Sequence, residues 1–256
     1  LVNTAKLQNN GTLENNGKIK KRKGSEIIGS VTGSGELIDK PYSTPTAAID
    51  YRAEKLTGLS ADISYLITFD INREDIDRPA EGEIDIKEHW LSKTLSITAK
   101  EDDNFLESEN QSLVVPARPA MTAVNGVDEA NYGKNDGKIT GTTDKMEYTL
   151  SSSNDWKPCT AGETKNLAPG KYLVRIAPSE NSFASEAAEV AIKKIHLITV
   201  ENIGGGTANA NKKEAYKDTE ITLTPTPESG HYFKEWQAVS PSDLQISTNN
   251  KFTMPD

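Results

Sequence analysis

Aliphatic residues recur every six positions at the start of the chain, with polar residues between them. The spacing is carried by Leu1, Leu7, Leu13 and Ile19. Short strands that stack side by side would place such residues in one internal column, and the intervening Asn-Asn-Gly triplets tolerate the left-handed backbone of each corner. The pattern predicts a short β-solenoid-like segment over residues 1–40, closed by the Gly-Ser-rich stretch at 29–38. The alternative is a disordered polar tether, which Asn, Gly and Lys also favour.

Alternating apolar and polar residues predict short antiparallel strands in the following part of the chain. In one such run Tyr172, Val174 and Ile176 share a face, and Asp136-Gly137 is a signal for a tight hairpin. Prolines at 41, 45, 116 and 119 separate two stretches of this kind. Neither stretch shows a convincing helix, so the pattern predicts two antiparallel β-sandwiches, at 41–117 and 118–193.

The two proline-bounded stretches resemble each other in sequence. The matched positions include Phe105 with Phe183 and Ser108-Glu109 with Ser185-Glu186. A duplicated unit of about 75 residues is the simplest explanation of these matches.

The second of these stretches resembles the immunoglobulin-like, fibronectin type III-like tandem modules of bacterial surface proteins. The resemblance rests on Tyr148 ahead of Trp156, on the turn and strand at 167–176, and on the run at 182–190 that leads into the last strand. It covers most of Ala117 to Ile192. It is weaker in the first stretch, where a longer acidic segment replaces the Trp-bearing hairpin. The resemblance implies two immunoglobulin-like sandwiches.

The end of the chain is similar to the divergent internalin B-type repeat of bacterial surface proteins. Four elements appear in the expected order: ITVENIGGGT, AYKDTEITLTPTP, GHYFKEW and FTMPD. The resemblance implies a compact β-grasp-like unit at 194–256. Such repeats usually continue into one more strand, so we expect this unit to be truncated at its C-terminus and the chain to be a piece of a longer protein.

Composition narrows the classes of function. The formal net charge is −9, and most of it lies between Tyr42 and Arg118, so we expect no nucleic-acid partner. The single cysteine, Cys159, excludes an internal disulfide and a cysteine-based zinc cluster, and we expect a small buried hydrophobe there. No apolar run approaches the roughly 20 residues that cross a bilayer, so we expect no membrane insertion within this sequence.

An acidic stretch contains the outline of a calcium loop. The candidate ligands are Asp70, Asn72, Glu74 and, at the twelfth position, Glu81. Asp75 stands where a calcium loop has glycine, Pro79 interrupts the second half, and no helices are predicted on either side. A solvated acidic loop is therefore the default interpretation, and calcium is the alternative.

Trp90 and Trp156 are candidates for stacking against sugar rings. Each stands where its segment calls for a core aromatic, and small domains without disulfides need their largest side chains inside, so a core position is the default. Tyr232 and Phe233 are assigned to the core for the same reason. The three histidines lie in separate segments without neighbouring ligand residues, so we predict no catalytic, cofactor-binding or metal site.

The sequence thus predicts an all-β, multidomain chain: a solenoid-like segment, two immunoglobulin-like sandwiches and a β-grasp-like repeat. We expect a non-enzymatic module of a bacterial surface protein, extracellular on the cell surface or in the cell wall, that acts in adhesion or as a stalk. Host or neighbouring-cell glycans and matrix proteins are the expected partners, and no cofactor is expected. The alternatives are a dedicated glycan- or matrix-binding module and an accessory region of a large secreted hydrolase.

Overall fold

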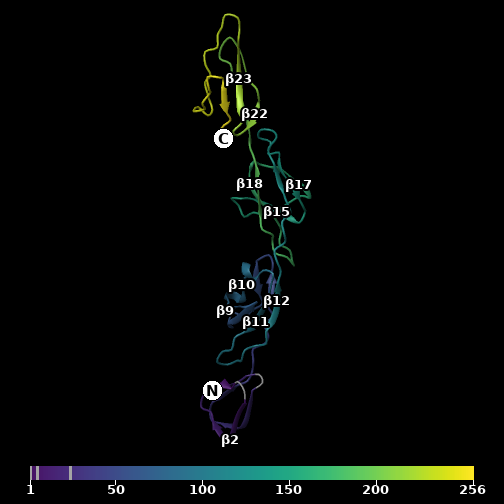
Figure 1. The fold of residues 1–256 in the computed structure, drawn as a ribbon, viewed down its shortest axis with the longest axis vertical. Coiled ribbons are helices and arrows are strands. Elements are labelled where there is room, and N and C mark those ends of the chain that lie inside the picture. Colours follow the sequence, from purple (N-terminus) through teal and green to yellow (C-terminus); the bar gives the residue numbers. More distant parts are fainter. Residues whose placement is uncertain (1, 4–5, 23–24) are drawn as a thin grey trace. The chain divides into compact units, whose positions relative to one another are not determined.

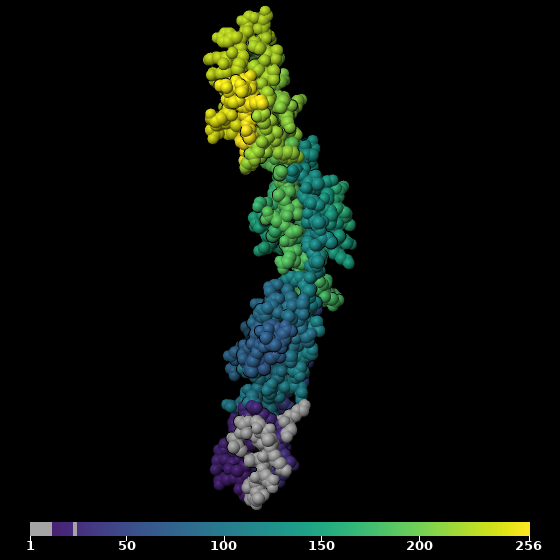
Figure 2. Space-filling view, viewed as in Figure 1, coloured from purple at the N-terminus to yellow at the C-terminus, as the bar shows by residue number. Residues whose placement is uncertain are grey.

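The computed structural model describes residues 2–3, 6–22 and 25–256, and it confirms the all-β prediction. In that part of the chain the helical segments are two single 3₁₀ turns, Ala80–Gly82 and Glu88–Trp90. The chain divides into two compact units, which can be followed by colour in Figure 1 and Figure 2. Unit 1 comprises Leu1–Pro119 and Pro178–Ala184, and unit 2 comprises Ala120–Ala177 and Ser185–Asp256.

Parallel strands form the beginning of unit 1. One sheet has the order β1-β3-β5, and a second sheet pairs β2 with β4. The strands are β1 (Val2–Asn3), β2 (Lys6–Glu14), β3 (Lys18–Lys21), β4 (Glu26–Thr32) and β5 (Glu36–Ile38). Every pairing is parallel, as expected for a chain that winds in successive coils.

The predicted six-residue column is wrong in its period. Ile19 lies opposite Leu37, and Leu13 lies opposite Val31. Six residues carry the chain along one side of a coil and round a corner, so residues six apart lie on successive sides and only every third such residue stacks. Ile19 is buried. Leu1 lies outside the described residues, and Leu7 is placed in β2 opposite Ile27.

The corners of these coils stack, but the left-handed backbone predicted for the Asn-Asn-Gly triplets is absent from Asn15, Asn16 and Gly17. The backbone N–H of Asn15 donates to the carbonyl of Thr32 (2.6 Å), and that of Gly35 donates to the carbonyl of Asn15 (2.7 Å). The Asn15 side-chain oxygen accepts from the N–H of Gly17 at 3.0 Å. A Cβ at Gly35 would lie only 2.3 Å from the Gly17 carbonyl oxygen, so a glycine is required there.

The first sandwich follows in unit 1 and consists of two antiparallel sheets. Their orders are β10-β7-β6 and β12-β11-β8-β9. The strands are β6 (Ala48–Asp50), β7 (Lys55–Thr57), β8 (Tyr65–Phe69), β9 (Asn72–Ile76), β10 (Ile84–Asp85), β11 (Lys93–Ala99) and β12 (Gln111–Val115). Alternate residues of both sheets meet in one core, with Leu56 from one sheet and Ile67, Leu95 and Ile97 from the other.

The second sandwich opens unit 2 and repeats this arrangement. Its sheets have the orders β13-β14-β17 and β16-β15-β18-β19. The strands are β13 (Asn125–Val127), β14 (Gly137–Thr142), β15 (Met146–Leu150), β16 (Lys157–Pro158), β17 (Gly162–Leu167), β18 (Gly170–Ile176) and β19 (Ala188–Ile192). Ile139, Tyr172 and Val174 lie in its core. Cys159 is buried there as predicted, and burial raises the pKa of its thiol.

The last part of unit 2 has its own small core. Strand β20 (Ile195–Leu197) pairs with β22 (Glu214–Tyr216). A second sheet has the order β21-β23-β24, formed by β21 (Gly206–Ala210), β23 (Glu220–Pro227) and β24 (Lys251–Thr253). The buried residues of this small core are Ala215, Ile221, Leu223, Phe252 and Met254.

One segment departs from the predicted domain boundaries. Pro178–Ala184 connects β18 to β19 of the second sandwich, yet it belongs to unit 1. The four predicted domains remain a prediction. The exchange of this segment between the units is a feature that no local pattern in the sequence indicates.

Candidate functional site

The predicted calcium loop is a β-hairpin. Strands β8 and β9 pair with Phe69 opposite Asn72, which leaves Asp70 and Ile71 as a two-residue turn. Asn72 and Glu74 lie on strand β9, whereas Glu81 lies in the separate 3₁₀ turn at 80–82. The pairing with β8 keeps this stretch extended, so both the calcium loop and the solvated acidic loop are corrected to a strand. In the described ranges, no group of three or more His, Cys, Asp or Glu side chains is arranged to hold a metal ion.

Glu74 is the centre of a polar cluster beside this hairpin. One of its carboxylate oxygens lies 2.6 Å from His89 Nε2 and accepts from Trp90 Nε1 at 3.1 Å. The other oxygen accepts from Lys87 Nζ. Burial acts against the charge of Glu74, but the hydrogen bonds from these three side chains outweigh it and lower the pKa of the carboxyl.

An open hollow of about 480 Å³ adjoins the cluster. It is lined by Phe69, Asp70, Asn72, Arg73, Glu74, His89 and Lys93. Lys93 pairs with Asp70 at 2.7 Å, and the ring of His89 stacks on that of Phe69 with centroids 5.4 Å apart. Three of the four calcium candidates thus line one hollow, and Glu81 is not among them. Glu74 contacts His89 and Lys93 contacts Asp70 within the hollow, whereas Arg73 pairs with Asp75 outside it.

The tryptophans divide between core and surface. Trp90 has no exposed surface, so the core prediction is confirmed and the stacking alternative is wrong for this residue. Trp156 is half-buried, and the guanidinium of Arg175 lies 3.9 Å from its ring centroid. Arg175 itself donates to Glu147 at 2.7 Å. One face of Trp156 is therefore covered by an arginine that is held in place by a carboxylate.

The core assignment of two other aromatic residues is wrong. Tyr232 is 84% exposed and Phe233 37% exposed. Both lie between β23 and β24, in a stretch without helix or strand. Without strand pairing, this stretch does not turn one face toward the small core, so the place of these residues in the repeat does not bury them.

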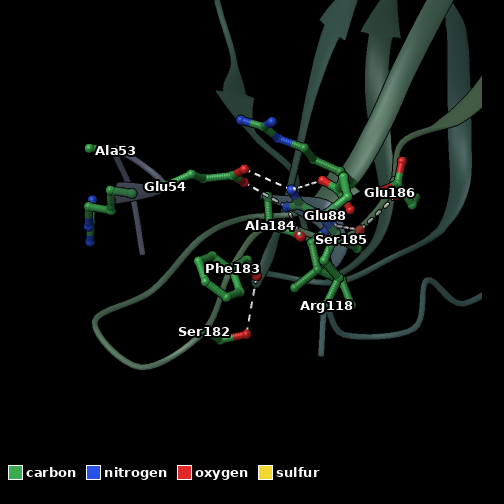
Figure 3. A network of polar contacts seen from close by, with 12 residues as sticks. Ala53, Glu54, Glu88, Arg118, Ser182, Phe183, Ala184, Ser185 and Glu186 are labelled. Atoms are coloured by element: carbon green, nitrogen blue, oxygen red, sulfur yellow. Dashed lines mark hydrogen bonds and ion pairs between the residues drawn. The ribbon is translucent and has the colours of Figure 1, made fainter. Parts of the chain in front are cut away.

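A second polar cluster surrounds Arg118 in unit 1 (Figure 3). Its two terminal nitrogens donate to the two oxygens of Glu54, at 2.6 and 2.7 Å. One of them also donates to Glu88 at 2.7 Å, and the other donates to the carbonyl of Ala184 at 3.3 Å. The Arg118 side chain is only 15% exposed. The hydrogen bonds that Arg118 donates to Glu54 and then to Glu88 raise its pKa, so its charge is fixed.

Phe183 lies beside this cluster and completes the core of unit 1. Its ring has no exposed surface and meets Tyr51 edge-on, with centroids 4.9 Å apart. The guanidinium of Arg118 lies 5.7 Å from the ring centroid. In Figure 3 the ring stands on the segment that also carries Ser182 and Ala184. A residue from the connection between β18 and β19 is thus packed with Leu56 and the other core residues of the first sandwich.

The matching connection of the first sandwich lies between β11 and β12. There Phe105 stacks on Tyr42, with centroids 4.6 Å apart, and Lys40 Nζ lies 5.7 Å from the Phe105 ring. The Tyr42 hydroxyl donates to Asp102 at 2.5 Å. This hydrogen bond raises the pKa of Tyr42 to about 12 and lowers the pKa of Asp102.

The hydrogen bonds of the two connections correct the predicted match of the phenylalanines. Asp102 N–H donates to the carbonyl of Phe105, and Ser179 N–H donates to the carbonyl of Ser182. Phe105 therefore corresponds to Ser182. The structural counterpart of Phe183 is the next residue, Leu106, which is buried as well. Sequence similarity aligned the two rings one position out of register.

Unit 2 contains a buried carboxylate, Glu129, which is 1% exposed. One of its oxygens accepts from the N–H of Asn135 at 3.0 Å, and the other accepts from the N–H of Ile195 at 3.4 Å. The hydroxyl of Tyr216 donates to the Glu129 carbonyl at 2.8 Å. Glu129 thus links the connection between β13 and β14 to strands β20 and β22.

Comparison with known proteins finds a similarity in one part of the chain. A family model described as the divergent InlB B-repeat domain matches residues 196–256. The predicted resemblance of the chain's end to this repeat is therefore confirmed, and the match begins within β20 and includes β21 to β24. No curated protein sequence matches the chain.

A solved structure is similar at a low level. It is the crystal structure of the chicken CNTN1 FN1–FN3 domains, at 13% sequence identity and a TM-score of 0.21, and the alignment covers 75% of this chain and 77% of that one. A likeness at this TM-score carries no argument, so the fold of each sandwich is described from its own sheets and core.

Proposed function

We propose that this chain is a non-enzymatic spacer of a bacterial surface protein, a region that separates other domains and carries mechanical load between them. Divergent InlB B-repeats occur in bacterial surface proteins. No helix in the described part of the chain has the length and apolar character needed to cross a membrane. The extracellular location and the absence of catalysis are part of the proposal.

The burial of Phe183 is the observation that carries this proposal. Removing a phenylalanine side chain from water contributes about 1.5–3 kcal/mol to stability. The ring is buried in unit 1, while the segment that bears it is joined at both ends to strands β18 and β19 of unit 2. A pull on unit 2 therefore also pulls on a side chain in the core of unit 1. A spacer under load gains from such a connection, because the segment at 178–184 cannot leave unit 1 without exposing the ring.

Single-molecule pulling on the chain tests the spacer function. The wild-type chain should show a distinct event for release of the segment at 178–184 before the strands of unit 1 unfold. In Phe183→Ala this event should be absent, while the later unfolding of unit 2 is unchanged. Val174→Ala, which weakens the core of unit 2, is the matched control and should leave the release event in place. A wild-type trace without a release event would contradict the load-bearing role.

Adhesion is the second candidate function, and an exposed apolar surface favours it. Ile203 is 94% exposed, Tyr232 84% and Val239 88%, all in the repeat at the end of the chain. Interaction sites are typically contiguous apolar patches, so this candidate requires the three side chains to form one patch. An immobilised panel of glycans, mucins and matrix proteins, probed with and without a calcium chelator, tests this candidate. Saturable binding that Tyr232→Ala abolishes and Tyr132→Ala leaves intact would support adhesion, and absence of saturable binding would contradict it.

A further inference from the structure

The site in unit 1 that holds Phe183 has the features of a peptide-binding site. The ring meets Tyr51 edge-on, with centroids 4.9 Å apart, and the guanidinium of Arg118 lies 5.7 Å from the ring centroid. The next residue, Ala184, is 3% exposed, and its carbonyl accepts a hydrogen bond from Arg118 at 3.3 Å. We name Tyr51 and Arg118 the socket. The socket thus holds an aromatic side chain and the backbone of the small residue that follows it.

Side chains of the first sandwich keep the socket in shape. Arg118 donates to the two oxygens of Glu54 at 2.6 and 2.7 Å and to Glu88 at 2.7 Å (Figure 3). Both glutamates belong to the first sandwich, so the guanidinium has fixed partners whether or not a ring is present. A site whose polar groups are oriented in advance loses less conformational entropy when it binds a ligand.

The segment at 178–184 is likewise shaped by its own hydrogen bonds. The N–H of Ser179 donates to the carbonyl of Ser182 at 2.9 Å, which closes a turn at the tip of the segment. At the base, the hydroxyl of Ser185 accepts from the N–H of Ile176 at 2.8 Å, and the Ser185 N–H donates to the Ile176 carbonyl at 3.2 Å. The turn and the base are therefore held by bonds that do not involve the socket.

The segment is docked in the socket without a covalent bond to it. Unit 1 continues into unit 2 from Pro119 to Ala120, whereas the segment is bounded by Ala177 and Ser185 of unit 2. The same segment of a second copy carries the same ring, carbonyl and turn. Exchange of an identical element between copies keeps the contacts of the single chain, and its main cost is the loss of translational and rotational freedom.

We propose that the socket also binds the segment at 178–184 of a second copy of this chain, so that copies join by exchange of this segment. The segment and the socket are different surfaces, and each copy offers one of each. Within one chain the effective concentration of the segment is on the order of millimolar, so the single chain is favoured in dilute solution and the exchanged form where copies are crowded. The inference does not rest on the spacer function.

Complementation between two variants of the full chain tests this proposal. Phe183→Ala keeps the socket and lacks the ring, whereas the double variant Tyr51→Ala with Arg118→Ala keeps the ring and lacks the socket. Mixed in equal amounts, the two variants should form a heterodimer in analytical ultracentrifugation, and each variant alone should remain a monomer at the same concentration. The matched control is Phe183→Ala mixed with the triple variant that carries all three substitutions, and this mixture should stay monomeric.

A synthetic peptide of residues 177–185 tests the socket by itself. It should bind Phe183→Ala at least about tenfold more tightly than the same peptide with alanine in place of Phe183, because only the first peptide buries the ring. If Phe183→Ala does not fold, Phe183→Leu takes its place, since the first sandwich has the buried Leu106 at the equivalent position. The proposal is overturned if the mixed variants stay monomeric, if the triple variant also forms the heterodimer, or if the two peptides bind equally.

Discussion

Two loops of unit 1 place their aromatic rings differently: Glu101–Leu106, the first loop, and Pro178–Ala184, the second loop. Both are followed by a serine whose hydroxyl accepts from the backbone N–H of the strand before the loop, Ser108 from Ala99 and Ser185 from Ile176. Phe105 is half-buried against Tyr42, whereas Phe183 has no exposed surface. The hydrogen bonds align Phe183 with Leu106 and Phe105 with Ser182. In an extended chain, a shift of one position turns a side chain to the opposite face. Changes at two neighbouring positions of a duplicated loop can thus move its largest side chain from a surface contact into a core.

The comparison also shows why the second loop belongs to unit 1. At the buried position the first loop has a leucine, and the second loop has a larger ring that reaches Tyr51. Arg118 then covers the edge of the site with a side chain that is 15% exposed, while its partner Glu88 stays 70% exposed to solvent. Size at one position and charge beside it together change a connection between two strands into a part of another core.

The largest effect is expected when the phenylalanine ring of the second loop is moved from position 183 to position 182. The double variant Ser182→Phe with Phe183→Ser gives the second loop the spacing of the first. The buried site would then hold a serine, and unit 1 should lose about 3–5 kcal/mol of unfolding free energy. Denaturant dependence of hydrogen exchange in β8 and β11 measures this loss.

The reciprocal exchange at the first loop is the matched control. Phe105→Leu with Leu106→Phe keeps both side chains apolar, so its effect should be smaller than that of the first exchange. Equal losses from the two exchanges would contradict the claim that the side chain at the buried position contributes to the difference.

Replacement of Arg118 by lysine should have an intermediate effect. A lysine keeps the charge but loses the paired hydrogen bonds to Glu54, so we expect a loss of about 1–2 kcal/mol in unit 1. Lys40→Arg at the equivalent linker should change stability by less than about 0.5 kcal/mol, because Lys40 is exposed. Chemical unfolding of each variant gives these values. If Arg118→Lys left the unfolding free energy of unit 1 unchanged, the paired hydrogen bonds of the guanidinium to Glu54 would contribute nothing beyond its charge.

High pH should loosen the first loop with a smaller effect. The folded pKa of Tyr42, about 12, lies above its ordinary value of 10.0 because the hydroxyl donates to Asp102. The stabilisation is therefore fully present below pH 10 and is lost as the pH rises from 10 toward 12.

Fluorine-labelled phenylalanine can report both loops in one NMR spectrum. The resonance of Phe105 should shift between pH 10 and 12 in the wild-type chain and stay constant over that range in Tyr42→Phe. A Phe105 shift that persists in Tyr42→Phe would assign the transition to another group.

The sequence indicates the elements of the fold and misses the contacts between distant segments. Alternation and turn residues predict the strands of both sandwiches, and the glycine and asparagine corners predict coils, because these signals are local. The stacking of Ile19 on Leu37 depends on how many sides each coil has, and the six-residue spacing does not contain that number. The hairpin at Asp70 escaped prediction because its acidic residues suppress the strand signal.

The candidate sites show the same limit. The position of Trp90 follows from its size and the need for a core, and it was predicted. Its hydrogen bond to Glu74 required a partner 16 residues away, on strand β9. The place of Phe183 required knowledge of which sandwich receives the loop. A phenylalanine in an otherwise polar connection is the one signal in the sequence that could have drawn attention to it.

Hydrogen exchange of Phe183→Ala tests the central claim most directly, namely that a residue between two strands of unit 2 stabilises unit 1. The account predicts exchange at least about 100-fold faster in β8 and β11 of unit 1, and less than about threefold faster in β15 of unit 2. Val174→Ala, in the core of unit 2, should give the opposite distribution. Faster exchange in β15 with β8 and β11 unchanged in Phe183→Ala would contradict the account.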